Sequence, residues 1–180
     1  MLARLFEAIG KLDGALFQEL REHHTALADT VMYTLSEAAR GNVLWIVLGV
    51  VLALAQPKRW SGVWQFILAI GLSALLANMV GKPLAGRARP FQTFAETRVV
   101  GSRPSSASFP SGHAANAFAA AYALTRVVPQ ARVIFWAIAL LVAYSRIYLG
   151  VHYPLDVIVG AVIGLAAAVL AIGGSRWDDG

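Results

Sequence analysis

The sequence predicts an all-α membrane protein, a polytopic bundle of about six transmembrane helices preceded by an amphipathic helix. Three observations support this fold class. Hydrophobic residues make up 58% of the 180 residues, charged residues make up only 14%, and the mean hydropathy is +0.62. Apolar segments also recur at lengths that reach across much of a bilayer. A soluble helical domain is the alternative, but too few polar residues remain to cover its core.

The first 24 residues contain the expected amphipathic helix. Within residues 2–22, large apolar residues recur at helical spacing, and the charged residues lie off that stripe. Both charge signs occur on the polar face, so this helix can lie flat in the membrane interface or pack on the bundle. We expect the interface. The charges interrupt the apolar run and argue against a signal peptide.

Six apolar segments follow in residues 25–175, which we expect to form one membrane-embedded domain. The first segment is the weakest, because Asp29 and Glu37 must face inward or toward an interface. The last is rich in glycine and alanine, which lets membrane helices approach closely. The expected spans are residues 25–39, 43–55, 62–81, 112–128, 133–149 and 155–173.

Basic residues in the short loops predict the orientation of these spans. Lys58 and Arg59 lie between the second and third spans. Arg126 and Arg132 flank the turn between the fourth and fifth. Because cytoplasmic loops are enriched in Lys and Arg, we expect these loops and both termini in the cytoplasm. The active-site loop 82–111 then faces the extracytoplasmic side of the cell (inner) membrane.

The formal charge of +5 is concentrated between the third and fourth spans, where five basic residues are opposed by one glutamate. Such a cluster at a membrane surface fits a phosphorylated or otherwise anionic substrate better than a nucleic acid, so we expect no nucleic-acid partner. The sequence has no cysteine, which excludes a disulfide framework, a thiolate nucleophile and a cysteine metal site.

Two motifs lie at the predicted outer ends of the third and fourth spans. In KPLAGRARP, Lys82 and Arg89 offer a compact cation and a planar fork for phosphate oxygens, although basic residues at a span end are often only interfacial anchors. In FPSGH, the Ser111 hydroxyl and the Gly112 N–H lie at a helix start, where the dipole favours an anion. His113 can protonate a leaving oxygen there. A simple helix N-cap is the alternative.

The third motif, SRIYLGVHYPLD, contains Arg146, His152 and Asp156. Arg146 is a charge inside an apolar span, which by default marks a functional site. His152 and Asp156 are four residues apart at a helix start and can pair. A carboxylate that accepts one imidazole N–H leaves the other nitrogen free to act as a nucleophile. For this motif alone, a structural His–Asp pair is the alternative. A metal site is less favoured, because Asp156 is better placed to orient His152.

The sequence resembles the type 2 phosphatidic acid phosphatase superfamily, which also includes bacterial non-specific acid phosphatases and vanadium haloperoxidases. The family signature is Lys-x6-Arg-Pro, Pro-Ser-Gly-His and Ser-Arg-x5-His-x3-Asp. This chain matches all three parts without a gap, at residues 82–90, 110–113 and 145–156. The six-span layout resembles the membrane branch of the superfamily.

The resemblance implies a reaction that needs no metal and no other cofactor. It assigns His152 as the nucleophile that becomes phosphorylated, Asp156 as the group that orients it, and His113 as the general acid. It also implies a set of groups that bind the phosphoryl oxygens: Lys82, Arg89, Ser111, Gly112 and Arg146.

We therefore expect a membrane phosphatase that hydrolyses a lipid phosphate or diphosphate. Undecaprenyl pyrophosphate is favoured over phosphatidylglycerol phosphate and phosphatidic acid by analogy with small six-span members. A lipid phosphotransferase with the same phosphohistidine fits the motifs equally well. A vanadium haloperoxidase fits poorly, because that branch is soluble. A transporter or binding protein for anionic lipids explains the cations, but not His113 or the spacing of His152 and Asp156.

Overall fold

The computed structural model describes residues 1–21, 24–55 and 60–173. Every regular element within these ranges is a helix, which confirms the predicted all-α class. Lys58 and Arg59, on which part of the predicted orientation rests, lie outside the described residues, as do residues 174–175 of the expected membrane domain. The helices are α1 (Leu2–Glu19), α2 (Ala26–Ala38), α3 (Val43–Ala55), α4 (Trp60–Ala74), α5 (Lys82–Ala85), α6 (Pro90–Thr93), α7 (Gly112–Val127), α8 (Arg132–Tyr148) and α9 (Pro154–Ile172).

Short irregular helices join some of these elements. The 3₁₀ helix η1 (Arg40–Asn42) connects α2 to α3, and η4 (Pro129–Ala131) connects α7 to α8. The π-helix η3 (Leu75–Gly81) continues α4 into α5. A π-turn inside a longer helix is rare and often occurs at a functional site. Here it immediately precedes Lys82.

Each of the six predicted spans coincides with a helix, and the first two are joined at a sharp bend. The helices α2 and α3 have 13 residues each and meet at a bend of 58°, where Gly41 and Asn42 adopt positive φ angles. They therefore form two halves of one bent path. By length and composition, three helical stretches in the described ranges can cross a membrane, or four if the bent pair counts as one span.

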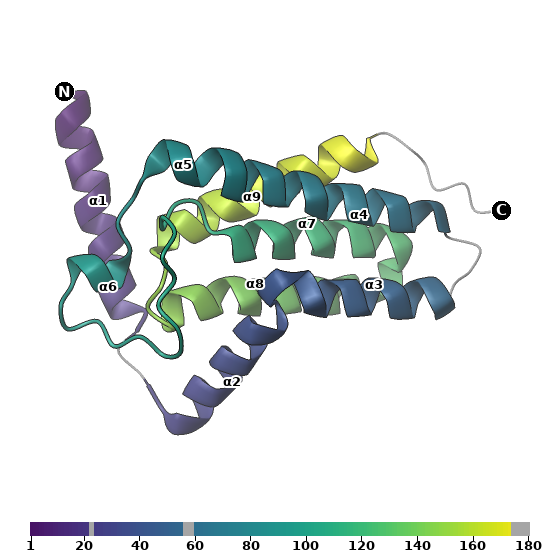
Figure 1. Ribbon diagram of the computed structural model, residues 1–180, viewed down its shortest axis with the longest axis horizontal. Coiled ribbons are helices and arrows are strands. Elements are labelled where there is room, and N and C mark those ends of the chain that lie inside the picture. The colour runs from purple at the N-terminus through teal and green to yellow at the C-terminus, as the bar shows by residue number, and fades with distance from the viewer. Residues whose placement is uncertain (22–23, 56–59, 174–180) are drawn as a thin grey trace.

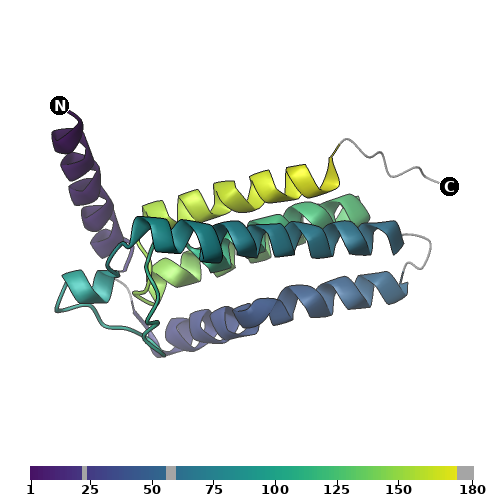
Figure 2. The same ribbon diagram turned by 45° about the horizontal axis from the view of Figure 1, so that its top comes forward.

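The long helices lie side by side along one axis, and α1 and the end of α9 lie at opposite ends of this bundle (Figure 1). The helix α1 lies at the same end as α5 and α6, whereas α9 ends at the other. The helices α2 and α3 advance together along the bundle instead of forming a hairpin (Figure 2). The expected location of both termini in the cytoplasm stays a prediction.

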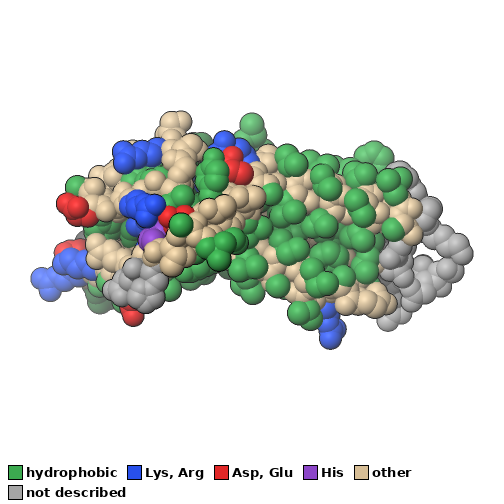
Figure 3. All heavy atoms as spheres, turned by 90° about the horizontal axis from the view of Figure 1, so that it is seen from below, with side chains coloured by type: hydrophobic (Ala, Val, Ile, Leu, Met, Phe, Trp, Pro, Cys, Tyr) green, Lys and Arg blue, Asp and Glu red, His purple; other side chains and the backbone are tan. Residues whose placement is uncertain are grey.

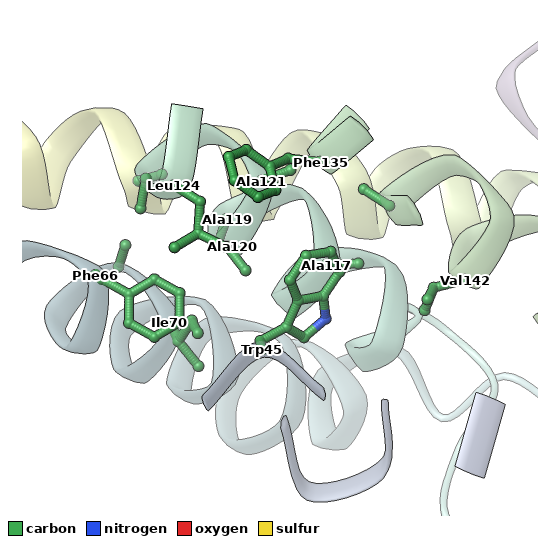
Figure 4. Close-up of a cluster of buried hydrophobic side chains, with 14 of the residues drawn as sticks. Trp45, Phe66, Ile70, Ala117, Ala119, Ala120, Ala121, Leu124, Phe135 and Val142 are labelled. Carbon is green, nitrogen blue, oxygen red and sulfur yellow. The ribbon is translucent and has the colours of Figure 1, made fainter. Parts of the chain in front are cut away.

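The core of the bundle is built around α7, whose alanines are almost completely buried. Trp45, Phe66 and Ile70 point toward this alanine surface (Figure 4). On the other side of α7, a side chain at Gly164 would lie 2.0 Å from the Ala115 carbonyl oxygen. Glycine is therefore required for α9 to pack directly on the α7 backbone, as the small residues of the last span predict.

The surface of the bundle separates into two zones. Most charged side chains gather at one end of the face shown in Figure 3, and hydrophobic side chains cover the remainder. Large apolar residues of α3, α8 and α9 are exposed on the surface of the bundle. Such a surface suits lipid rather than water, so the structure supports a membrane location.

The helix α1 runs across the bundle axis instead of along it (Figures 1 and 2). One face exposes a stripe of large apolar residues: Leu2, Leu5, Phe6, Ile9, Leu12 and Leu16. The last turns of the helix pack on the bundle through Phe17, which is 1% exposed and contacts the rings of Phe94 and Tyr153. The expected position of α1 in the membrane interface stays a prediction.

The acidic residues of α2 face inward, as predicted. Asp29 is buried and accepts hydrogen bonds from the Tyr148 hydroxyl (2.7 Å) and from Arg98 (2.8 Å). Glu37 pairs with Arg40 at 2.7 Å. The Tyr148 contact holds α2 on α8, and all three contacts give the carboxylates polar partners.

Candidate active site

A cavity of about 540 Å³ lies at the end of the bundle near α5. Its walls come from the α2–α3 bend, the η3–α5 segment, the loop after α6, the start of α7 and the α8–α9 turn. Of the eight predicted site residues, Ser111 and Asp156 lie behind the wall and are completely buried. The other six line the cavity: Lys82, Arg89, Gly112, His113, Arg146 and His152.

His152 lies in the tight turn between α8 and α9. Gly150 adopts a φ of 81° in this turn, and the His152 N–H donates to the Arg146 carbonyl (3.2 Å). Its Nε2 atom lies 3.3 Å from Nη1 of Arg89. Its Nδ1 atom lies 3.6 Å from Oδ2 of Asp156, slightly beyond hydrogen-bond distance. One ring nitrogen thus faces a cation and the other faces a carboxylate.

The pKa of His152 is lowered to about 3, mainly by burial. The contact with Asp156 raises this pKa, and the positive charges of Arg146 and Arg89 lower it. The imidazole is therefore neutral at neutral pH and keeps a nitrogen lone pair, which a nucleophile requires.

Asp156 is held by three donors besides the histidine. Its Oδ2 atom accepts from the Ser108 hydroxyl (2.5 Å) and from the Tyr153 N–H (2.9 Å). Its Oδ1 atom forms an ion pair with Arg87 at 2.6 Å. Because the carboxylate is completely buried, these contacts compensate for its loss of water. They also fix Oδ2 on the side of His152.

Two of the cations are anchored by the loop that follows α6. Arg89 donates from Nε to the Ser106 carbonyl (2.8 Å) and from Nη1 to the Val151 carbonyl (2.7 Å). Lys82 reaches the Ser106 hydroxyl at 3.4 Å. The loop is therefore the frame that keeps these two charges in the wall of the cavity.

Unpaired polar atoms mark the opposite wall. The Nε2 atom of His113 and the Nε atom of Arg146 are buried and have no hydrogen-bond partner. Arg146 also donates from Nη1 to the Ser36 hydroxyl. Buried polar groups are normally paired, so unpaired atoms at a cavity indicate where a polar ligand would bind. Within the described ranges, no cluster of three or more His, Asp or Glu residues could hold a metal ion.

Ser111 and Gly112 shape the start of α7. The Ser111 hydroxyl accepts from the Ala114 N–H (3.4 Å), and its own N–H donates to the Asp156 carbonyl (2.9 Å). Ser111 is therefore the N-cap of α7. A side chain at Gly112 would lie 2.5 Å from the Asn78 side-chain oxygen, so glycine allows η3 to approach this helix start.

Sequence reasoning missed polar residues on the wall nearest the α2–α3 bend. Arg40 and Asn42 line the cavity there, and Arg40 donates to the Ser102 hydroxyl (3.0 Å). Asn116 also lines it, three residues after His113 on the same helix. That spacing could have indicated Asn116. No local pattern indicates Arg40, because the bend alone places it at the cavity.

Helical packing and site geometry together define a membrane enzyme that acts on phosphate groups. The match of the chain to a family model confirms this class. The chain belongs to the PAP2 superfamily, whose model matches residues 62–177. It is a membrane lipid phosphatase, a hydrolase of phosphate ester or diphosphate bonds.

Named relatives and solved structures agree with this assignment. An undecaprenyl-diphosphatase of Sulfolobus acidocaldarius is 33% identical over 158 residues, which cover 87% of this chain and 75% of that protein. The crystal structure of Aquifex aeolicus LpxE matches with a TM-score of 0.78 and 30% identity, over 88% of this chain and 93% of that one. The crystal structure of a PAP2-type phosphatidylglycerolphosphate phosphatase of Bacillus subtilis matches with a TM-score of 0.75 and 28% identity, over 94% of this chain and 89% of that one.

Proposed function

We propose that this protein hydrolyses a lipid diphosphate through a phosphohistidine on His152. The observation that carries this proposal is the position of His152, neutral and buried at the cavity wall between Arg89 and Asp156. Nε2 attacks phosphorus, and the bond between phosphorus and the leaving oxygen breaks. His113 gives that oxygen its proton. Water then attacks the phosphohistidine, the P–N bond breaks, and His113 accepts the proton of the water.

The positive charges supply the remaining stabilisation. Lys82, Arg89 and Arg146 surround the space where the phosphoryl oxygens would lie, and their charge opposes the charge that develops in the transition state. We propose that the Gly112 N–H contributes a further donor. Ser111 would contribute by fixing the helix start, since its hydroxyl caps α7.

The size of the cavity supports a diphosphate over a monophosphate. A single phosphoryl group contacts only the wall formed by the histidines and the three cations. Arg40, Asn42 and Asn116 line the rest of the cavity and offer donors to a second phosphate. The named Sulfolobus relative acts on undecaprenyl diphosphate, and we propose the same substrate for this chain, ahead of phosphatidylglycerol phosphate and phosphatidic acid.

The proposed orientation places the cavity on the extracytoplasmic side of the cell membrane. Arg126 and Arg132, at the far end of the bundle, would then face the cytoplasm in agreement with the enrichment of basic residues there. The helix α1 would lie in the outer interface beside the cavity, and α9 would end at the cytoplasmic side.

Trapping of the covalent intermediate tests the mechanism. The parent protein, quenched in alkali during turnover of labelled substrate, should retain base-stable, acid-labile phosphate on His152. His152→Ala should retain none and should release phosphate at least about 10³-fold more slowly. A folded His152→Ala protein with the parent rate would contradict the proposal. His24→Gln is the matched control, because His24 lies outside the cavity.

Two further assays test the role of His113 as general acid and the identity of the substrate and of the phosphate acceptor. His113→Asn should slow turnover of phosphatidic acid, whose leaving group is an alcohol, by about 10²–10⁴-fold, yet slow an aryl phosphate much less, because a good leaving group needs no acid. A panel of undecaprenyl diphosphate, phosphatidylglycerol phosphate and phosphatidic acid ranks the substrates. Transfer of phosphate to an added acceptor lipid, instead of water, would identify a phosphotransferase.

A further inference from the structure

One arginine in the first motif does not take part in the cavity wall. Arg87 lies between two carboxylates, with Nη1 at 2.6 Å from Asp156 and Nη2 at 2.7 Å from Asp13. Its guanidinium also lies 4.0 Å above the ring of Tyr153. Both ends of the planar fork are therefore occupied by protein groups. Arg87 is thus a bridge between two protein segments and not a ligand for phosphate, unlike the three cations of the cavity.

The second carboxylate comes from α1, far from the motifs in sequence. Asp13 is 6% exposed and lies on the face of α1 that packs against the bundle. Its other oxygen accepts a hydrogen bond from the Leu155 N–H (2.9 Å). Leu155 belongs to the first turn of α9, one residue before Asp156. Asp13 therefore holds both the cation that binds Asp156 and the helix start that carries it.

The contacts of Asp156 show why this link matters for His152. The Arg87 ion pair occupies Oδ1, so Oδ2 is left on the side of the histidine, where Ser108 also binds it. The Ser108 N–H donates to the Arg87 carbonyl (2.8 Å), so the two groups that flank the carboxylate are tied to each other. Without Asp13, one half of the Arg87 fork would be free and the arginine could rotate away from Asp156.

We infer that Asp13 and Arg87 are positioning residues for the reaction and that α1 is part of the active site. They act through Asp156, which they hold in the geometry that orients His152, so the inference rests on the proposed function. Asp13 lies before residues 62–177, the part matched by the family model. The interfacial helix thus supplies a support for the nucleophile that the family motifs do not contain.

Three variants test this link by steady-state kinetics in detergent micelles. Asp13→Asn removes the charge but keeps an oxygen that can accept from Leu155, so α1 can still dock. Arg87→Gln removes the bridge. The third variant combines both changes. Glu7→Gln is the matched control on the same helix, because Glu7 is exposed and pairs with the exposed Lys11.

Asp13→Asn and Arg87→Gln should each lower kcat about 10–100-fold and leave KM within about twofold, with a matching fall in the rate of phosphohistidine formation. The double variant should be no slower than Arg87→Gln, because both changes break one chain of contacts. Glu7→Gln should behave like the parent. Thermal unfolding of all four proteins establishes that they are folded.

Several results would overturn the inference. A parent value of kcat for folded Asp13→Asn would show that α1 does not support the nucleophile. A rise in KM at unchanged kcat would show that Arg87 binds substrate directly. Additive losses in the double variant would show two independent effects. None of these results bears on the covalent step itself, because trapping of phosphate on His152 tests that step separately.

Discussion

At the scale of single residues, the site depends on burial of groups that water would otherwise satisfy. His152 is 2% exposed and Asp156 is completely buried, yet they lie next to a cavity that a charged substrate must enter. Burial keeps the imidazole neutral, and a fixed set of donors keeps the carboxylate ionised. The proposed nucleophile and its partner thus have the required charge states before substrate arrives.

The lowered pKa of His152 predicts how stability depends on pH. This pKa is about 3 in the folded protein and 6.5 for an ordinary histidine, so below about pH 6.5 the unfolded chain binds a proton that the folded protein does not. The free energy of unfolding should therefore decrease as pH falls from 6.5 toward 3, by up to about 1.4 kcal/mol per pH unit from this residue. This decrease in the free energy of unfolding is measured by thermal unfolding of the parent and of His152→Gln between pH 7 and pH 5. An equal slope in both proteins would contradict the assignment.

The cations of the cavity predict insensitivity to metal removal. Lys82, Arg89 and Arg146 already provide positive charge where a metal ion would neutralise phosphate. Phosphate release should therefore be unchanged after dialysis against excess chelator. The assay is phosphate release in micelles with and without chelator. A loss of activity that a divalent ion restores would mean that these cations are insufficient.

The motifs predicted most of this residue-level picture because each keeps its residues close in sequence. His152 and Asp156 share one turn, and Ser111 to His113 share one helix start, so spacing alone places them. The contact of Asp13 with Leu155 joins residues 142 positions apart and leaves no local pattern. Such contacts follow from how α1 docks, which periodicity does not determine.

At the scale of helices, the positions of the apolar segments were predictable and their connections were not. Hydrophobic runs gave α7, α8 and α9 to within about one residue. The bend between α2 and α3 depends on two residues with positive φ, Gly41 and Asn42, and apolar runs contain no signal for its angle. The predicted spans at residues 25–39 and 43–55 therefore coincide with α2 and α3, but the bend that joins these helices was not predicted.

The contact between α7 and α9 predicts the effect of filling a glycine. A Cβ atom at Gly160 would lie 2.4 Å from the Ser111 carbonyl oxygen, so Gly160→Ala should push α9 away from the N-cap that precedes His113. We expect a loss of about 1–3 kcal/mol in stability together with reduced activity. Thermal unfolding and phosphate release measure both.

Gly71→Ala is the control for this prediction. No atom lies within 4 Å of the position of its Cβ, and alanine favours a helix by about 0.5–1 kcal/mol over glycine. This variant should therefore be as stable as the parent or more stable. Equal unfolding temperatures for the two variants would mean that the α7–α9 contact can relax at no cost.

At the scale of the whole molecule, charge and chemistry share one end of an apolar bundle. The cavity, the active-site loop and α1 lie at this end, and the α7–α8 turn lies at the other (Figure 1). An arrangement of this kind assigns the reaction to one membrane surface.

The proposed orientation predicts the labelling of introduced cysteines. The sequence contains no cysteine, so each variant carries a single thiol. Ala95→Cys, in the exposed loop near the cavity, should react with a membrane-impermeant maleimide in intact cells. Gln130→Cys, in the exposed α7–α8 turn, should react only after permeabilisation. The reverse result would place the cavity in the cytoplasm.

The bend between α2 and α3 has a kinetic consequence. Residues 39–42 line the cavity where α2 diverges from the bundle. We therefore expect the reacting headgroup to enter there from the leaflet while its tail stays among the acyl chains. Withdrawing a long prenyl tail into water would require about 0.8 kcal/mol per methylene, a barrier that this route avoids. The substrate then reaches the enzyme by diffusion within the plane of the membrane. Turnover should follow the mole fraction of substrate in the membrane, and added inert lipid should slow it at constant bulk concentration.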